Sequence, residues 1–252
     1  FQIKALSATG RRMLSYLNKK QNEVFGFCES FIFGNDTIKG KIKTDTGLVK
    51  DEQSRLKSTN QMDVLRAVAF SFELATKPFR VNCGLFGAMS YDFIDQFEKL
   101  PANERDILKN PDYELYFADN IFLVDHNEGG GYIIVNVVIT DDDKDTAMSQ
   151  AQQVSDYYFN MARFDTPVPE KYACEADGPG TDTTQEEYEK MVKTAKEHII
   201  EGDVFQVVLS RTVTEPCPDE PLDVYRRLRK LNPSPYMFYL NTPNTILMGS
   251  SP

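Results

Sequence analysis

Residues that could act as acids, bases or nucleophiles are few in this chain, and none has a recognisable catalytic spacing. The two histidines, His126 and His198, lie far apart, and neither has the neighbours that a catalytic triad or a zinc site requires. We interpret both as structural, with His198 late in an expected helix, where a positive ring suits the helix dipole. The serines form no G-x-S-x-G elbow, and Walker and G-x-G-x-x-G loops are absent.

Metal and disulfide chemistry finds equally little support. The chain has four widely spaced cysteines, Cys28, Cys83, Cys174 and Cys217. They form no C-x-x-C pair, so we interpret them as free thiols of a cytosolic protein. The acidic run from Asp141 is not a calcium loop, because Thr146 and Gln152 occupy the positions that need Gly and Glu.

The segment "LNPSPYMFYL" has the most suggestive chemistry. Pro233 and Pro235 fix φ at about −65° and push the residues before them toward extended geometry, so the segment holds its shape with few contacts. The proline carbonyls and the amides of Tyr236 and Met237 then lie beside an aromatic ring and a thioether. Together these groups could form a binding slot that suits a free aromatic amino acid. A plain joint between a helix and a strand is the alternative, which the residues alone favour.

Two polar residues interrupt the apolar stretch "VFQVVLSRTV", which we expect to be a strand covered on both faces. Gln206 and Ser210 both lie at even positions and therefore point to one face. Buried polar groups need partners. Gln206 and Ser210 could therefore hydrogen-bond to a neighbouring loop or line a site, and the sequence does not decide between these two roles. Arg211, on the other face, could pair with an acidic side chain.

The elements that would position these residues alternate between strands and helices. Residues 22–33 are rich in residues that favour strands, and residues 37–58 are polar, which predicts an exposed excursion from the fold. The stretch "VNCGLFGAM" is typical of a buried strand, and its two glycines indicate positions where another backbone comes close. We expect hairpins across "NEGGG" and "NTPN". Helices are expected from about Thr9, from Thr59 or Asn60, over 92–100, over 141–163 with three aspartates at its start, after a Thr184–Glu187 capping box, and over 221–231. The sequence predicts a mixed α+β fold in which antiparallel sheets pack with helices.

Length and charge bound the class of protein. The 252 residues divide into 1–165, a Pro-, Gly- and acid-containing linker at 166–182, and 183–252. The formal charge of −10 disfavours nucleic acid and anionic membranes as partners. The sequence shows neither an apolar run of about 18 residues nor a secretory signal, and we expect a cytoplasmic protein. The missing initiator Met suggests that the natural start lies upstream.

Several segments together resemble the anthranilate synthase component I family. The most specific are "GDVFQVVLSR", "NPSPYMFYL" and "ILMGSSP"; "GLFGAMSYDFIDQFEKLP" and "PDYELYFADNIFLVDH" are similar to the same family and keep its order. The resemblance runs from about Phe1 to Pro252. It implies the anthranilate/aminodeoxychorismate synthase-like fold and the conversion of chorismate and ammonia to anthranilate and pyruvate in tryptophan biosynthesis. It also implies Mg²⁺ on the substrate carboxylate and a glutamine amidotransferase subunit that supplies the ammonia.

The resemblance further implies feedback inhibition by L-tryptophan. The family's tryptophan-binding Pro-Tyr-Met segment matches Pro235, Tyr236 and Met237. Residues that could shape this site are Asn232, Pro233, Ser234, Gln206 and Ser210. The family's other contact, a Leu-Leu-Glu-Ser segment, has no match, and "CES" at 28–30 is not at the corresponding place.

The family's magnesium ligands, catalytic histidine and chorismate contacts all lie beyond Pro252. We therefore expect no catalytic or metal-binding residue here, and a chain that is inactive alone. Residues 1–165 would be a regulatory and partner-docking region, and 183–252 the incomplete start of a chorismate-binding domain. The alternatives are aminodeoxychorismate synthase component I, which "PYM" disfavours, and a non-catalytic amino-acid-binding or docking module.

Overall fold

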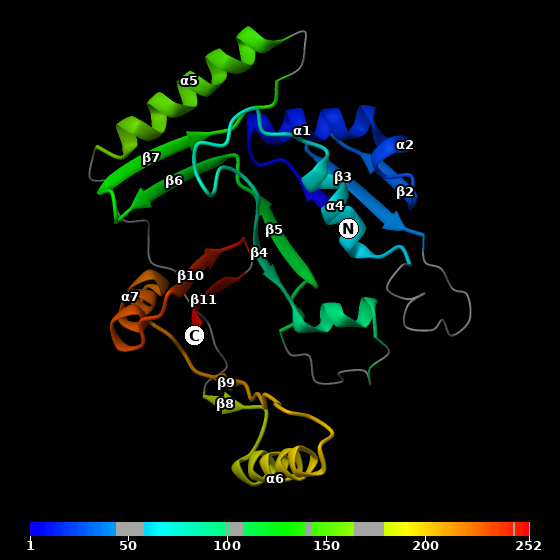
Figure 1. Cartoon of the computed structure of the whole chain (residues 1–252), viewed down its shortest axis with the longest axis vertical. Helices are drawn as coiled ribbons and strands as arrows, with labels where there is room; N and C mark the ends of the chain where they lie inside the picture. Colours follow the sequence, from blue (N-terminus) through cyan, green and yellow to red (C-terminus); the bar gives the residue numbers. More distant parts are fainter. Residues whose placement is uncertain are drawn as a thin grey trace. The chain divides into compact units, whose positions relative to one another are not determined.

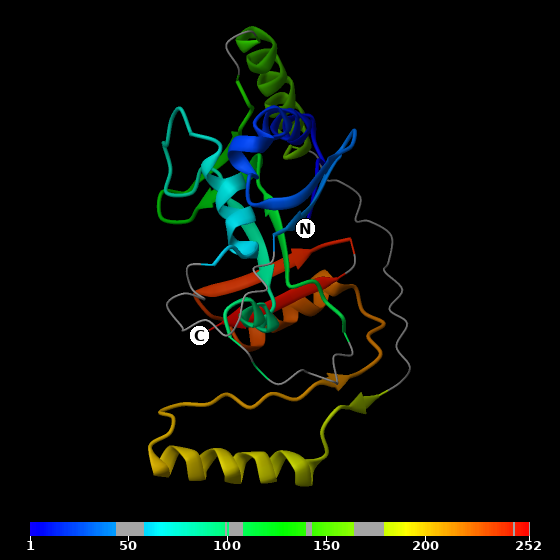
Figure 2. The ribbon, with the colours of Figure 1, turned by 90° about the vertical axis from the view of Figure 1, so that its right-hand side faces the viewer.

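The computed structural model describes residues 1–43, 58–98, 100, 108–139, 143–163, 179–243 and 245–251. The chain forms two compact units, residues 1–166 and 167–252. Figures 1 and 2 show the elements of both units, coloured along the sequence. The structure confirms a mixed fold whose paired strands are antiparallel. No helix of the described residues is long and apolar enough to cross a membrane.

The first unit begins with a three-stranded sheet in the order β1-β3-β2. Its elements are β1 (Gln2–Lys4), α1 (Ala8–Lys19), α2 (Gln21–Val24), β2 (Cys28–Phe33), β3 (Thr37–Ile42) and α4 (Gln61–Phe70). The core of this unit is made where α1 and α4 meet the sheet, because the apolar residues of both helices recur at helical spacing. It contains Ala5, Leu14, Leu17, Phe25, Ile38, Ile42, Val64 and Val68.

The starts of α1 and α4 are set by side-chain caps. The Ser7 hydroxyl accepts a hydrogen bond from the Gly10 N–H at 2.9 Å. Asn60 caps α4 through the Met62 N–H, and the Asp63 carboxylate accepts the Asn60 N–H at 2.9 Å. These bonds satisfy N–H groups that have no partner within the helix. The predicted start of α4 at Thr59 or Asn60 is confirmed, with Asn60 as the cap.

The prediction of an exposed excursion after residue 36 is wrong for its first part. Residues 37–42 form the central strand of the sheet, and Ile38 is fully buried. Ile38, Gly40 and Ile42 alternate with two lysines, so one face of this strand is apolar despite its polar composition. The N–H of Gly40 donates to the Phe1 carbonyl at 3.1 Å, and the Phe1 ring covers the glycine. Residues 44–57, also in the expected excursion, lie outside the described residues.

Among its other described residues, this unit forms two antiparallel strand pairs, a 3₁₀ helix and a long α-helix. Its elements are β4 (Leu85–Met89), the 3₁₀ helix η1 (Tyr91–Gln96), β5 (Tyr113–Phe117), β6 (Asn120–Asp125), β7 (Gly130–Val135) and α5 (Lys144–Met161). The predicted hairpin across "NEGGG" is confirmed by the pairing of β6 with β7. The helix expected over 92–100 is a shorter 3₁₀ turn.

The strand predicted within "VNCGLFGAM" exists, but it is not buried. The side chains of Phe86 and Met89 are both 43% exposed. The expected close approach of a second backbone is confirmed at Gly87, where an added Cβ would lie 2.1 Å from the Glu114 carbonyl oxygen. At Gly84 a second backbone also comes close, since the Ala118 N–H donates to the Gly84 carbonyl at 3.0 Å, but an added Cβ would meet only the Phe86 ring at 3.5 Å.

Polar contacts tie α1 to the region around the β6–β7 hairpin. The Ser7 hydroxyl donates to the Asp119 carboxylate at 2.5 Å. Further along α1, Arg12 donates to the Val138 carbonyl at 3.0 Å and pairs with Asp143 at 2.9 Å. These bonds join residues more than 110 positions apart, so they hold the first sheet and the later hairpin in one unit.

The described residues of the second unit form two helices and two small antiparallel pairs of strands. Its elements are β8 (Gly180–Thr181), α6 (Gln185–Glu201), β9 (Val213–Thr214), α7 (Pro221–Leu231), β10 (Tyr236–Asn241) and β11 (Ile246–Ser251). The predicted capping box is confirmed, with the Thr184 N–H donating to Glu187 at 2.9 Å. Gly202 ends α6 in the left-handed conformation at φ 85°, which glycine adopts without strain.

The prediction that "VFQVVLSRTV" is a covered strand is wrong for most of its length. Only Val213 and Thr214 form a strand, and residues 204–212 have no regular structure. A strand with two apolar faces needs paired neighbours and a layer on each side. Within the described residues nothing provides them, and Phe205 has its whole side chain in solvent.

Candidate functional site

The predicted binding segment joins α7 to the β10–β11 hairpin. α7 begins with Pro221 at its first turn, where the missing N–H costs nothing, and ends with Arg229 and Lys230, which suit the dipole. The ring of Tyr225 on α7 contacts that of Tyr239 on β10 edge to face, with centroids 5.6 Å apart. α7 therefore packs on the hairpin face that carries Tyr239.

Three hydrogen bonds hold the linker between α7 and β10. The Asn232 N–H donates to the Leu228 carbonyl at 2.8 Å, and the Asn232 carbonyl accepts the Ser250 hydroxyl at 2.6 Å. The Ser234 hydroxyl accepts the Tyr236 N–H at 3.2 Å. The "NPSP" linker is thus bonded at both ends, in agreement with the stiffness predicted from its prolines.

The structure places the predicted tryptophan contacts on both sides of β10. Tyr236 and Phe238 lie on the open face, and Tyr236 is 69% exposed. Neighbouring strand residues point to opposite faces, so Met237 lies on the face that carries Tyr239. On that face it is half-buried. Pro235 is exposed. A ligand on the open face would therefore meet the Tyr236 ring, and Met237 would act from the α7 side.

Gln206 and Ser210 are not buried on one face of a covered strand, as was expected. Both are exposed, and within the described residues neither makes a hydrogen bond. The reason is the missing sheet: without covering layers, their side chains stay in water. Arg211 makes a cation–π contact with Tyr188, because its guanidinium lies 5.8 Å from the centroid of the Tyr188 ring.

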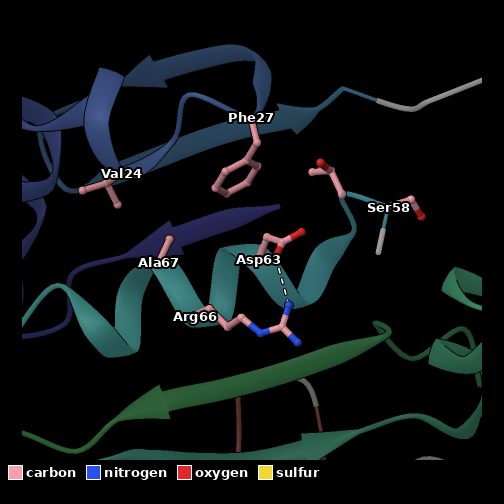
Figure 3. Close-up of a pocket in the computed structure, with 7 residues that line it drawn as sticks. Val24, Phe27, Ser58, Asp63, Arg66 and Ala67 are labelled. Atoms are coloured by element: carbon pink, nitrogen blue, oxygen red, sulfur yellow. Dashed lines mark hydrogen bonds and ion pairs between the residues drawn. The ribbon is translucent and has the colours of Figure 1, made fainter. Parts of the chain in front are cut away.

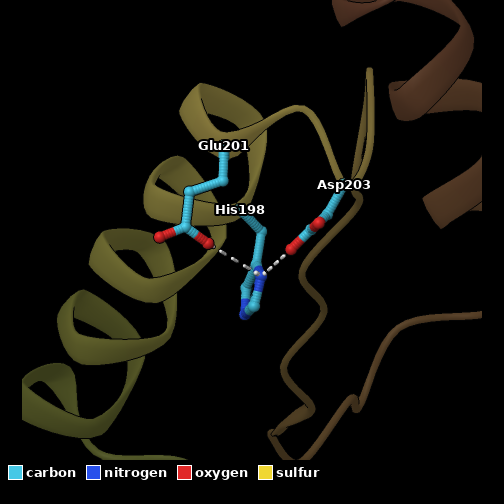
Figure 4. Close-up of side chains that lie close together, drawn as sticks. All are labelled: His198, Glu201 and Asp203. Carbon is cyan, nitrogen blue, oxygen red and sulfur yellow. Dashed lines mark hydrogen bonds and ion pairs between the residues drawn. The ribbon is translucent and has the colours of Figure 1, made fainter.

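A cluster of titratable side chains lies at the C-terminal end of α6 (Figure 4). The Nδ1 atom of His198 is 2.7 Å from Asp203 Oδ2 and 4.0 Å from Glu201 Oε2. The hydrogen bond to Asp203, with the nearby charges of Glu201 and Glu197, raises the pKa of His198 above its ordinary value of 6.5. His198 was predicted to have a structural role. The structure identifies its hydrogen-bond partner, Asp203, which the sequence reasoning had missed.

The charge of His198 is therefore expected to stabilise the end of α6 in a pH-dependent way. A raised folded-state pKa means that the stabilisation is complete below pH 6.5 and is lost as pH rises through the raised pKa. We expect Asp203→Asn to lower the pKa of His198, measured by NMR titration of its ring protons. Glu186→Gln, at the other end of α6, is the control. An unchanged His198 titration in Asp203→Asn would contradict this role.

An open cavity of about 570 Å³ lies in the first unit (Figure 3). Phe27 and Val24 form one side, and Asp63 and Ala67 of α4 form the other. The Asp63 carboxylate is already engaged by the α4 cap and by Arg66 at 3.0 Å. The cavity contains none of the predicted site residues, which belong to the second unit, and its paired charges point to no particular ligand.

Comparison with known proteins shows the family. The sequence pattern described as "chorismate binding enzyme" matches residues 16–252. The chain belongs to the chorismate-binding enzyme family. It is 30% identical over 250 residues to anthranilate synthase component 1 of Vibrio parahaemolyticus, covering 98% of this chain and 44% of that protein. It is 29% identical over 261 residues to the protein of that name in Haemophilus influenzae, covering 99% and 46%.

The solved structure of another protein has the same fold as this chain. The crystal structure of anthranilate synthase component I from Streptococcus pneumoniae matches 90% of this chain and 47% of that chain, with a TM-score of 0.62 and 21% identity. The chain spans less than half the length of the relatives that it matches. The recognition made from the sequence motifs is therefore confirmed at the level of family and fold.

The described residues of this chain do not fit a Mg²⁺ site. The cluster of His198, Glu201 and Asp203 is the one group of three or more such ligands found among them, and all three residues are exposed. Mg²⁺ prefers an octahedral shell of oxygen atoms, whereas this cluster offers an imidazole whose Nδ1 is bonded to Asp203.

Cys28 and Cys83 are half-buried thiols, and burial raises the pKa of each. Cys174 lies outside the described residues.

Proposed function

We propose that this chain is part of an anthranilate synthase component I. The complete protein would convert chorismate and ammonia to anthranilate and pyruvate in tryptophan biosynthesis, with Mg²⁺ and a glutamine amidotransferase subunit as its cofactor and partner. The observation that carries this proposal is that the matches to two proteins of this name cover 98% and 99% of this chain. The continuous family match over residues 16–252 supports chorismate as the substrate.

The 252-residue chain is proposed to be inactive by itself. It spans less than half the length of its relatives, and the one cluster of possible metal ligands among the described residues is exposed at the end of α6. His198 is occupied at the end of a surface helix. The chain would then contribute a regulatory and partner-docking region together with the beginning of the chorismate-binding domain.

The test uses the full-length protein with chorismate, Mg²⁺ and ammonia. We expect fluorescent anthranilate and pyruvate in equal amounts, while the 252-residue chain under the same conditions forms neither. Aminodeoxychorismate or isochorismate as the main product would overturn the assignment in favour of another branch of the family. Reading the gene past Pro252 separates the enzyme from a non-catalytic amino-acid-binding module, because a stop codon at that point would favour the module.

Tryptophan is proposed to inhibit the complete enzyme by binding at the start of β10. The support is a stiff linker that is hydrogen-bonded at both ends, followed by an exposed Tyr236 ring. An aromatic ring of this kind offers a flat apolar surface to an indole. As the resemblance to the family implies, binding would act on the reaction by a change of conformational state.

Met237→Thr is expected to weaken tryptophan inhibition of the full-length enzyme while turnover stays nearly unchanged. The substitution replaces a polarizable thioether beside the proposed site with a smaller polar side chain. The measurement is the tryptophan concentration that halves the initial rate. Met148→Thr, at a 53% exposed position of α5, is the matched control. Unaltered inhibition in a folded, active Met237→Thr enzyme would count against the site.

A further inference from the structure

Ser250 of β11 lies directly opposite Met237 in the β10–β11 hairpin. The side chains of two directly paired residues point to the same face of an antiparallel pair. Ser250 therefore lies on the face that carries Met237 and Tyr239, where Tyr239 contacts the Tyr225 ring of α7. Ser250 is half-buried. Its side chain is thus directed toward the helix and away from the open face on which Tyr236 lies.

The hydroxyl of Ser250 bonds to the first residue of the Asn232–Pro235 linker. It donates to the Asn232 carbonyl at 2.6 Å, although the two residues are 18 positions apart. Asn232 also caps the end of α7, where its N–H donates to the Leu228 carbonyl at 2.8 Å. Among the described residues, no other hydrogen bond joins the linker to β11. One side chain therefore ties the end of the helix and the start of the linker to the hairpin.

The linker carries the position of Asn232 to β10 because it is stiff. Its two prolines fix their own φ angles and restrict the residues before them. The Ser234 hydroxyl accepts the Tyr236 N–H at 3.2 Å, which fixes the last part of the linker on the strand. Few free torsions remain between Asn232 and Tyr236, so a shift of the first residue displaces the second. The bond from Ser250 thus helps to set the direction in which the chain enters β10.

We propose that Ser250 is a positioning residue for inhibition by tryptophan: its hydroxyl fixes the linker on the hairpin, so that the Tyr236 ring and the Met237 thioether are arranged before the ligand binds. This inference rests on the tryptophan site proposed above. Ser250 acts through Asn232 and does not touch the ligand, because its proton is donated to the Asn232 carbonyl on the α7 side of the hairpin. A site that is arranged in advance binds more tightly, since binding no longer includes the cost of ordering it.

The first test measures tryptophan inhibition of the full-length enzyme after Ser250→Ala. Loss of one such bond is expected to raise the tryptophan concentration that halves the initial rate by about three- to tenfold. Without tryptophan, kcat and the KM for chorismate should not change, since the bond acts on the inhibitor segment. Ser250→Thr keeps the hydroxyl and should therefore retain the inhibition of the parent enzyme.

Ser71→Ala is the matched control for this test. The Ser71 hydroxyl also donates to a carbonyl at the end of a helix, that of Ala67 in α4, but it belongs to the first unit and should leave inhibition unchanged. Inhibition of Ser250→Ala at the parent's tryptophan concentration would overturn the inference. Equally weak inhibition in Ser250→Thr would overturn it too, because the hydroxyl would then not be what matters.

The Met237→Thr enzyme separates a failure of this inference from a failure of the proposed site. If Met237→Thr weakens inhibition and Ser250→Ala does not, the tryptophan site stands and the role of Ser250 is wrong. If neither substitution weakens inhibition, the site itself is wrong, and the positioning role is refuted with it.

A second measurement needs no tryptophan and therefore does not depend on the proposed function. In the full-length enzyme, Ser250→Ala should accelerate hydrogen exchange at the amides of Asn232 and Tyr236, since both belong to the segment that the bond holds in place. The amides of α6, in the same unit, should exchange at the parent rate and show that the unit is folded. Unchanged exchange in the segment would overturn the inference even if inhibition weakened, because Ser250 would then act by direct contact with the ligand.

Discussion

Replacing Leu17 by alanine is expected to lower the free energy of unfolding of the first unit by about 2–5 kcal/mol. Leu17 is 1% exposed and lies in the core cluster between α1 and the three-stranded sheet. Removing three buried carbons loses their transfer free energy and leaves a cavity that the surrounding side chains fill only in part.

The measurement must report on the first unit alone, because the chain has two units. Urea-dependent hydrogen exchange of the α1 peptides meets this need. Leu6→Ala is the matched control: the same substitution at a side chain that is 66% exposed should change stability by no more than about 0.5 kcal/mol. Equal effects at the two positions would show that α1 does not bury Leu17 in the core.

The second large effect is expected at the β4–β5 hairpin, where Gly87→Ala should destabilise the first unit by about 1–3 kcal/mol. An added Cβ would lie 2.1 Å from the Glu114 carbonyl oxygen and 2.9 Å from the Leu115 Cα. Both atoms are backbone, so no side-chain rotation relieves the contact. The two strands must separate locally, which weakens the ladder that pairs Gly87 with Leu115.

Gly131→Ala provides the comparison for this prediction. Gly131 also lies in a paired strand, but its added Cβ would meet only the Phe122 ring at 3.7 Å, an ordinary contact. We expect hydrogen exchange of β4 and β5 to accelerate in Gly87→Ala and to stay near the parent rate in Gly131→Ala. Unchanged exchange in β4 and β5 of Gly87→Ala would mean that these strands approach each other less closely.

Local signals in the sequence predicted local structure well. The Thr184–Glu187 capping box and the turns of the β6–β7 and β10–β11 hairpins act within a few residues. Their physical cause is short-range hydrogen bonding and backbone sterics, which need no partner from elsewhere in the fold. The family was likewise readable from motifs.

Burial could not be predicted in the same way. Residues 37–42 seemed polar, yet Ile38 is the centre of the first sheet because β1 and β2 pair on both its sides. The stretch 204–212 seemed buried, yet it is exposed because no strand pairs with it among the described residues. In both cases the deciding neighbours lie far away in the sequence or are absent from the described structure.

For the candidate site, the sequence by itself determined the stiff Asn232–Pro235 linker and the residues that follow it, because proline restricts its own backbone and that of its neighbour. Only the tertiary structure decided which side chains face which way. The packing of α7 against Tyr239 places Met237 on the covered side of the hairpin and leaves Tyr236 in solvent. That division follows from strand geometry combined with a helix that covers one face only.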